Sequence, residues 1–288
     1  MTDWQQRLAD INRPWQGTGL AVVAHLHPDD VAAGFGHSVL GLEMFDAAGP
    51  RRLIHPRETG GDRLGFISAP SGGGRLAGGR NMVVTEFLRS YPYAEWLLCV
   101  DSDMTFEADS LERLIQSADP VERPVMGGLC FGRIYQGHGR GHAASVNWQP
   151  TIYYRQDEWM SQPAFEYPQG VVPCSETGAA FLLIHRSVLL ELHRLHGQTW
   201  FDNIPGETPG QWAGEDLSFC RKAVAAGFPV HVNADVKIGH SKTVVFGEAD
   251  YRLHRRPSSS AVTVVIPVKD NVEMTRDLCG QLLAFGGY

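Results

Sequence analysis

Several residue classes are scarce in this chain of 288 residues, and each scarcity excludes a class of protein. The sequence has only 5 cysteines, an odd number with no C-x-x-C pair, so we expect reduced thiols in the core rather than a disulfide scaffold. The longest apolar run, residues 179–184, is too short to cross a bilayer. Because the N-terminus also lacks an apolar signal segment, we expect a soluble cytoplasmic protein with no membrane span.

Positive charge is also in short supply. The chain carries 25 Lys and Arg residues against 32 Asp and Glu residues, a net charge of −7, so no global field draws it to nucleic acid or to an anionic membrane. Hydrophobic residues make up 43% and charged residues 20%, which excludes fibrous, low-complexity and coiled-coil proteins. This composition names no chemistry, so the function must be sought in local groups of residues.

What the sequence does contain is an alternation of short apolar strands and amphipathic helices. Apolar runs predict strands at 20–24, 64–68, 96–100, 124–129, 180–184 and 230–232, and apolar residues with helical spacing lie between them. This order predicts an α/β fold in which helices cover both faces of a mainly parallel sheet. The segment 131–169 has no clear period, and we expect a long, partly ordered insertion there.

Two carboxylates directly follow the expected strand 96–100. Asp101 and Asp103 stand where a buried strand meets its loop, and ligands bind at the carboxyl ends of strands in open α/β sheets. Carboxylate oxygens in this D-x-D arrangement suit Mg²⁺ or Mn²⁺. The alternative is that these acids only cap the next helix, but Asp109 and Ser110 lie closer to that helix and are better placed to cap it.

A second acidic pair, Glu215 and Asp216, begins a later helix, on which Leu217, Cys220 and Val224 are predicted to face inward. Acids in a first helical turn gain about 0.3–1 kcal/mol each from the helix dipole, so a purely structural role is one interpretation. The other is a general base, a carboxylate that takes a proton from an acceptor hydroxyl. His240 ends the last strand-like run and is either a structural side chain or a third metal ligand.

The glycine-rich segment 71–81 precedes an apolar helical pattern. It contains Arg75 and Arg80, and we expect a flexible loop that presents their guanidinium groups to a diphosphate. The alternative interpretation is a solvated loop without a ligand.

A competing metal motif lies near the N-terminus. His25, Asp29 and Asp30 belong to an H-P-D-D sequence that resembles the zinc motif of the N-acetylglucosaminyl-phosphatidylinositol de-N-acetylases. No segment resembles that family's second histidine motif, and short motifs often match by chance, so we do not expect a zinc site there.

A more specific resemblance rests on four segments in a fixed order: GGRNMVVTEFL, EWLLCVDSDM, TGAAFLLIHRSVL and GEDLSFCRKAVAAGFPVHVNADVKIGH. Together they resemble the GT-A glycosyltransferases of the family 2-like group over residues 20–240. The resemblance implies a three-layer α/β/α sandwich with a mostly parallel mixed sheet. It also implies a nucleotide-diphosphate sugar as donor, Mn²⁺ or Mg²⁺ as cofactor, and transfer of a sugar to an acceptor hydroxyl.

The resemblance further implies roles for the acidic residues. Asp101 and Asp103 match the D-x-D that binds the metal and the donor diphosphate or ribose, and His240 matches a histidine that joins this metal site in some members. Asp216 matches the catalytic base of inverting members, with Glu215 beside it in the motif. Metal-supported departure of the diphosphate, with Asp216 as the base, is the mechanism that the resemblance implies.

Other matched positions lie near the donor or on the acceptor side of its sugar. Arg80 and Asn81 match an A-R-N segment near the donor, with Gly79 in place of the alanine. Thr177, Gly178 and Ala179 match a segment that lines the acceptor side of the sugar. The first strand departs from the family pattern, because His25-Leu26-His27-Pro28 replaces the usual proline-containing turn, so the nucleobase contacts are not carried over.

The C-terminal part predicts a domain boundary. Residues 257–260 are linker-like, and residues 262–271 resemble the opening strand of another family 2-like domain. We therefore expect a GT-A domain at 1–256 and, at 257–288, a linker plus the truncated start of a second such domain.

The acceptor stays open at this stage between a glycan, a small molecule and modified DNA. An alternative function is a nucleic-acid-directed module, either a glycosyltransferase acting on a hydroxylated base or a non-catalytic binder of nucleotide sugars or nucleic acid. Its basis is two local basic clusters, Arg133, His138, Arg140 and His142, and Arg252, His254, Arg255 and Arg256.

Overall fold

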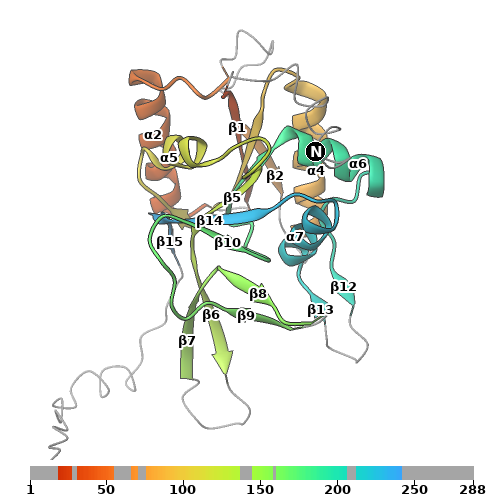
Figure 1. Ribbon diagram of the computed structural model, residues 1–288. Helices are drawn as coiled ribbons and strands as arrows, with labels where there is room; N and C mark the ends of the chain where they lie inside the picture. Colours follow the sequence, from red (N-terminus) through yellow and green to blue (C-terminus); the bar gives the residue numbers. More distant parts are fainter. Residues whose placement is uncertain are drawn as a thin grey trace, which may run out of the picture. The chain divides into compact units, whose positions relative to one another are not determined.

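The computed structural model has a seven-stranded sheet at its centre (Figure 1). The described residues are 19–27, 31–54, 66–70, 76–136, 145–157, 160–205 and 212–241. All of them belong to the first of two units, Met1–Lys242. The second unit, Thr243–Tyr288, lies outside the described residues, as do the predicted boundary at 256 and the predicted second domain.

The sheet is mixed and mostly parallel, with the strand order β10-β14-β5-β11-β3-β1-β2. β1 pairs in parallel with β2 and β3, and β14 pairs in parallel with β5. β11 lies antiparallel between β3 and β5, and β10 is antiparallel to β14 at one edge. The seven strands are β1 (Ala21–His27), β2 (Phe66–Pro70), β3 (Trp96–Asp101), β5 (Val125–Leu129), β10 (Val171–Cys174), β11 (Phe181–His185) and β14 (Val230–Lys237).

Helices cover both faces of this sheet. The helices are α2 (Ala33–Ala48), α4 (Leu76–Ser90), α5 (Ser110–Ser117), α6 (Arg186–His196) and α7 (Glu215–Ala225). Leu97 and Leu182 face the layer formed by α4, α6 and α7, where Phe87 is fully buried. Their neighbours Leu98 and Leu183 face the opposite layer, formed by α2 and α5. The predicted three-layer α/β/α sandwich is therefore confirmed.

The central strands read as continuous apolar runs because both of their faces are covered. Every residue of β5 and β11 is buried, and so is every residue of β3 up to Asp101 at its end. Strands buried on both sides lose the apolar–polar alternation of a half-exposed strand. Because burial gives these strands continuous apolar runs, their predicted bounds lie close to the observed ones.

The described parts of the predicted insertion at 131–169 include two short antiparallel strand pairs. They are β6 (Phe131–Gln136) with β7 (Ser145–Pro150) and β8 (Tyr153–Arg155) with β9 (Ser161–Pro163), and they lie below the main sheet in the view of Figure 1. Two further antiparallel pairs lie outside that segment, β12 (Ile204–Pro205) with β13 (Trp212–Ala213) and β4 (Met104–Thr105) with β15 (Gly239–His240).

Two local predictions were wrong. The glycine-rich segment does not continue as a loop to Asn81, because α4 begins at Leu76 and places Arg80 inside the helix. Val224, predicted to face inward, is 48% exposed, because the buried stripe of α7 runs through Phe219, Cys220 and Ala223 instead.

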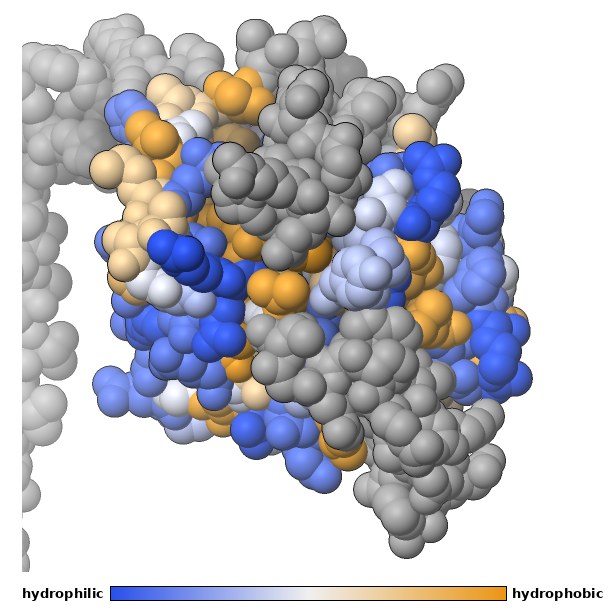
Figure 2. Space-filling model, turned by 90° about the horizontal axis from the view of Figure 1, so that it is seen from above, coloured by the Kyte–Doolittle hydropathy of each residue, from blue (hydrophilic) through white to orange (hydrophobic). Residues whose placement is uncertain are grey.

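The surface is mixed in character. Seen from above, hydrophilic side chains cover both flanks, and apolar side chains show between them (Figure 2). Across the described residues, no helix combines the length and apolar character that a membrane crossing requires.

Candidate active site

The predicted acidic residues lie near one end of the central strands, where β3 ends and β11 begins. Asp101 is the last residue of β3, and Gly178 and Ala179 lie just before β11, which runs in the opposite direction beside it. The strand direction therefore places the end of one strand beside the beginning of the other, and Asp101 N donates to Ala180 O across them at 3.0 Å. Glu215 and Asp216, in the first turn of α7, lie near the same end of these strands.

Asp103 and His240 form a pair although 137 positions separate them. His240 Nε2 lies 3.1 Å from Asp103 Oδ2, and His240 Nδ1 lies 3.2 Å from the carbonyl oxygen of Phe131. The β4–β15 ladder sets this approach by placing His240 opposite Met104. A Cβ at Gly239 would collide with the Thr105 hydroxyl, so this ladder requires glycine beside the histidine.

The hydrogen bonding of His240 fits a metal ligand. A carbonyl oxygen only accepts, so Nδ1 carries the hydrogen and the second nitrogen of a neutral ring turns its lone pair toward the Asp103 carboxylate. Two hydrogen-bond acceptors at this distance repel one another unless a proton or a cation lies between them. A backbone carbonyl that fixes the tautomer of a histidine is typical of metal sites.

Asp101 does not join this pair. Its Oδ1 accepts a hydrogen bond from Arg80 Nη2 at 3.0 Å. Among the described residues, no cluster of three or more His, Cys, Asp or Glu side chains is arranged to hold a metal ion. Asp103 and His240 could provide two ligands, and a cation bound there would take its others from water and phosphate oxygens, as Mg²⁺ commonly does.

Arg80 links the two acidic motifs. It is 4% exposed, and its Nη1 donates to Ala179 O at 3.0 Å, its Nη2 binds Asp101, and its Nε lies 3.5 Å from Glu215 Oε1. The guanidinium also lies over the Phe201 ring, 5.8 Å from its centroid. One buried cation therefore joins the end of β3, the start of β11 and the start of α7.

Burial and the neighbouring carboxylates shift the pKa of Arg80 in opposite directions. Burial lowers the pKa of the guanidinium, but the carboxylates of Asp101 and Glu215 raise it, and the net pKa lies above its ordinary value. Arg80 is thus permanently charged, and its charge is committed to these carboxylates. The predicted contact of Arg80 with a donor diphosphate stays a prediction.

The Asn81 side chain binds the backbone of a neighbouring segment. Its Oδ1 accepts from the backbone amides of Trp200 and Phe201 at 3.1 and 2.9 Å, and its Nδ2 donates to Phe201 O at 2.8 Å. Both ends of the side-chain amide are therefore used to hold the segment that supports the Arg80 guanidinium.

Asp216 lies beside a pocket. Its Oδ1 accepts from Leu217 N at 2.8 Å, and a Cβ added at Gly178 would lie 3.7 Å from Oδ2. Burial and then the Glu215 carboxylate raise the pKa of Asp216, while the Arg80 guanidinium opposes them. The result is a carboxylate that holds a proton more strongly than an exposed aspartate does.

The pocket beside Asp216 contains residues that the sequence did not single out. Its volume is about 280 Å³, and its lining includes Gln149, Tyr153, Ser161, Leu217 and Arg221. Three of these come from the β7, β8 and β9 region, whose short strands carry no periodic pattern. The only sequence signal for Leu217 and Arg221 is their position one and five residues after Asp216 on the same helix.

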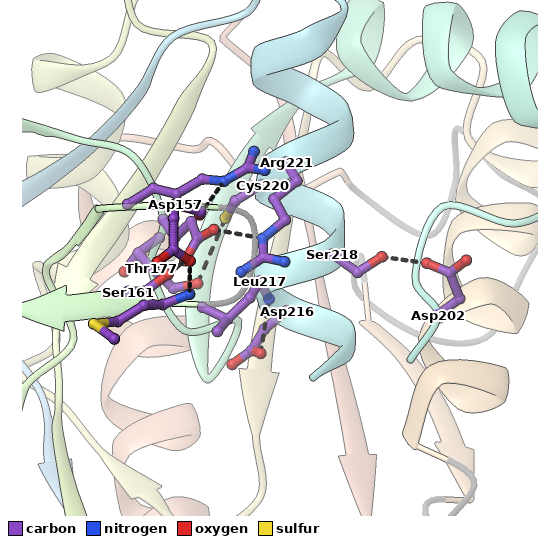
Figure 3. Close-up of polar contacts among 12 residues, drawn as sticks. Asp157, Ser161, Thr177, Asp202, Asp216, Leu217, Ser218, Cys220 and Arg221 are labelled. Carbon is purple, nitrogen blue, oxygen red and sulfur yellow. Dashed lines mark hydrogen bonds and ion pairs between the residues drawn. The ribbon is translucent and has the colours of Figure 1, made fainter. Parts of the chain in front are cut away.

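Both sides of α7 are anchored by polar contacts (Figure 3). Arg221 Nε donates to Glu176 Oε1 at 2.6 Å, and Ser161 Oγ donates to the other oxygen of this carboxylate. On the opposite side, Ser218 Oγ and Lys222 Nζ donate to Asp202, the latter at 2.7 Å. These contacts fix the helix that carries Asp216.

Several predicted residues lie outside the described structure. These are Arg75, the Pro28–Asp30 part of the H-P-D-D motif, and the side chains of both basic clusters. The residues that the structure does bring together are Asp103 with His240, and Asp101, Glu215 and Ala179 with Arg80.

Comparisons with known proteins concern the fold. No protein-family model matches the sequence, and a search of curated proteins finds no match. The structure is similar to one described as "Crystal Structure of A197 from STIV", with a TM-score of 0.42 and 15% identity over 78% of this chain and 86% of that one. It is also similar to "Crystal structure of GalNAc-T7 with UDP, GalNAc and Mn2+", with a TM-score of 0.48 and 10% identity over 78% of this chain. The match covers 44% of that second chain, less than half of its length.

Proposed function

We propose that this chain is a metal-dependent GT-A glycosyltransferase that moves a sugar from a nucleotide-diphosphate sugar to an acceptor hydroxyl with inversion. The observation that carries the proposal is that Arg80 contacts both Asp101 and Glu215. The two acidic motifs are therefore parts of one site near one end of the central strands. Sugar transfer needs both functions in one place, a group that neutralises a departing diphosphate and a base for the acceptor.

Asp103 and His240 are the residues proposed to hold the divalent metal. The Asp103 carboxylate is an oxygen ligand of the kind that Mn²⁺ and Mg²⁺ sites use, and the His240 imidazole beside it is a nitrogen ligand common in metal sites. When bound, the ion supplies positive charge that stabilises the departing nucleoside diphosphate. Asp101 is assigned to positioning, because its carboxylate is bound to Arg80.

Asp216 is proposed as the base. Its carboxylate accepts the proton of the acceptor hydroxyl while the acceptor oxygen bonds to the anomeric carbon. The bond from that carbon to the diphosphate oxygen breaks, and its electron pair leaves with the nucleoside diphosphate. Attack from the face opposite the leaving group inverts the anomeric centre.

Arg80 and Glu215 are proposed to position the base. Glu215 precedes Asp216 in the first turn of α7 and faces Arg80, so the ion pair orients this turn against the end of β3. A buried, hydrogen-bonded frame of this kind keeps a catalytic carboxylate in place without contacting the substrate itself.

The test is nucleotide binding and sugar transfer measured on the same variants of the full chain. Calorimetry with UDP, GDP and dTDP, with and without Mn²⁺, should show metal-dependent binding that Asp103→Ala and His240→Ala abolish. Asp216→Asn should keep this binding and lose transfer from the corresponding nucleotide sugars. Absence of metal-dependent binding in the unmodified chain would overturn the proposal, and full transfer by Asp216→Asn would overturn the assignment of the base.

A further inference from the structure

The pocket beside Asp216 has a chemistry of its own. In addition to the carboxylate, its lining offers the Gln149 amide, the Tyr153 phenol and the Ser161 hydroxyl. Gln149 Nε2 donates to Tyr153 Oη at 3.2 Å, which orients both groups and leaves the phenol hydrogen directed elsewhere. Amide, phenol and hydroxyl groups both donate and accept, which suits hydroxyl groups on a ligand.

The charges of the pocket do not favour an anion. Arg221 is its cationic lining residue, and the guanidinium donates to Glu176 Oε1 at 2.6 Å. Glu176 is 1% exposed, so this ion pair is largely removed from water and its charges cancel locally. The Asp216 carboxylate then leaves the pocket with a negative balance, which disfavours phosphate and carboxylate groups.

The walls of the pocket are held in place before any ligand arrives. Tyr153 N donates to Glu176 O at 3.0 Å, and Ser175 N donates to Tyr153 O at 3.0 Å. Ser161 binds the same glutamate that holds Arg221, so the β8–β9 hairpin is tied to α7 through one buried carboxylate (Figure 3). A preformed site binds its ligand with a smaller loss of conformational entropy.

The size of the pocket limits what can enter. At about 280 Å³ it is smaller than the range of about 300–1,000 Å³ that is typical of sites for drug-sized ligands. A single hydroxylated ring is therefore the appropriate occupant, and a base flipped from a duplex would bring its phosphates toward an acidic site.

We propose that this pocket binds the acceptor, and that the acceptor is a neutral, polyhydroxylated ring of the size of one sugar residue. The inference rests on the proposed function, since Asp216 must act as base for a hydroxyl held there. One hydroxyl lies against Asp216 and loses its proton to it as its oxygen bonds to the donor's anomeric carbon. Tyr153, Gln149 and Ser161 contact the remaining hydroxyls and determine the specificity.

The test combines a panel of acceptors with a panel of UDP-, GDP- and dTDP-hexoses and Mn²⁺. The acceptors are the methyl glycosides of glucose, galactose, mannose and N-acetylglucosamine, their 6-phosphates, and a DNA duplex containing 5-hydroxymethylcytosine. Release of nucleoside diphosphate above the rate without acceptor, together with the product mass, reports transfer. We expect at least one neutral glycoside to stimulate release, and the phosphates and the duplex to have no effect.

Two variants separate the pocket from the rest of the site. Leu217→Trp fills the pocket and should reduce stimulated release at least about tenfold, the lower end of the discrimination that a steric mismatch in a binding pocket gives. Gln162→Trp is the matched control, because Gln162 is exposed and lies next to Ser161 on β9. Tyr153→Phe removes only the phenolic hydroxyl and should raise the acceptor KM about 2- to 10-fold with little change in kcat.

The outcomes distinguish the two proposals. Metal-dependent nucleotide binding with no stimulation by any neutral glycoside, or with stimulation only by the phosphates or the duplex, overturns the acceptor assignment alone. Equal stimulated rates for Leu217→Trp and Gln162→Trp also overturn it. Absence of nucleotide binding in the unmodified chain overturns the proposed function, and this inference with it.

Discussion

The two acidic motifs of the site divide in the same way. In the first, Asp101 is bound to Arg80 and Asp103 faces His240; in the second, Glu215 faces Arg80 and Asp216 faces a pocket. Each motif therefore has one carboxylate that pairs with Arg80 and one that does not. A single buried cation creates this difference between neighbouring residues of nearly identical chemistry.

The largest expected effect comes from Asp216, the carboxylate of the second motif that faces the pocket. Asp216→Asn removes the proton acceptor and should lower kcat by about 10²- to 10⁴-fold, the usual contribution of a general base. Nucleotide binding measured by calorimetry should stay within error of the unmodified chain. Glu215→Gln is the partner variant, and an equal loss of kcat in both would break the comparison between the two carboxylates.

The next largest effect should come from the cation that the two motifs share. Arg80→Met leaves the Asp101 and Glu215 carboxylates without their buried partner and should cost about 3–5 kcal/mol of unfolding free energy. Urea unfolding measures this cost. Arg89→Met is the matched control on the same helix, because Arg89 forms an exposed pair with Glu86, and such pairs contribute about 0–1 kcal/mol. Similar losses in the two variants would contradict the role given to Arg80.

Asn81 sharpens the distinction between positioning and binding. Asn81→Ala leaves the backbone groups of Trp200 and Phe201 without their partners and should cost about 1–3 kcal/mol. Met82→Ala, at a side chain that is 60% exposed, is the control. We expect metal-dependent nucleotide binding to persist in the folded Asn81→Ala protein; its loss at full stability would make Asn81 a donor contact instead.

The smallest expected effect is a shift of a pH profile. Burial and then Glu215 raise the pKa of Asp216, and the base acts only when deprotonated, so kcat/KM should fall toward acid at a pH above the ordinary aspartate range. Glu215→Gln removes one of the causes that raise the pKa and should move this acid limb to lower pH. A limb that moves to higher pH would show that Glu215 acts chiefly by positioning Arg80.

The central strands and the positions of the acidic residues at their ends were predictable, because strands buried on both faces have continuous apolar sequences. The run 96–100 followed by Asp101 predicted both β3 and the position of the first motif, and the helix at Glu215 and Asp216 was confirmed. The fold class followed from the alternation of such runs with amphipathic helices.

Other parts of the site left no readable pattern. β8 and β9 have three residues each, too few for a period, so Tyr153 and Ser161 were missed. Arg80 stands among glycines and suggested a loop, but the helix buries it because the carboxylates of distant segments compensate its charge. Such compensation depends on tertiary contacts, and local sequence does not record it.

The claim that one carboxylate of each motif pairs with Arg80 and the other acts on the ligand is tested most directly by the Mn²⁺ dependence of nucleotide binding in two variants of the first motif. Asp103→Asn should lose the Mn²⁺ dependence at unchanged thermal stability, whereas Asp101→Asn should keep the dependence and lower the melting temperature. Loss of Mn²⁺ dependence in Asp101→Asn with retention in Asp103→Asn, or equal loss in both, would contradict the account.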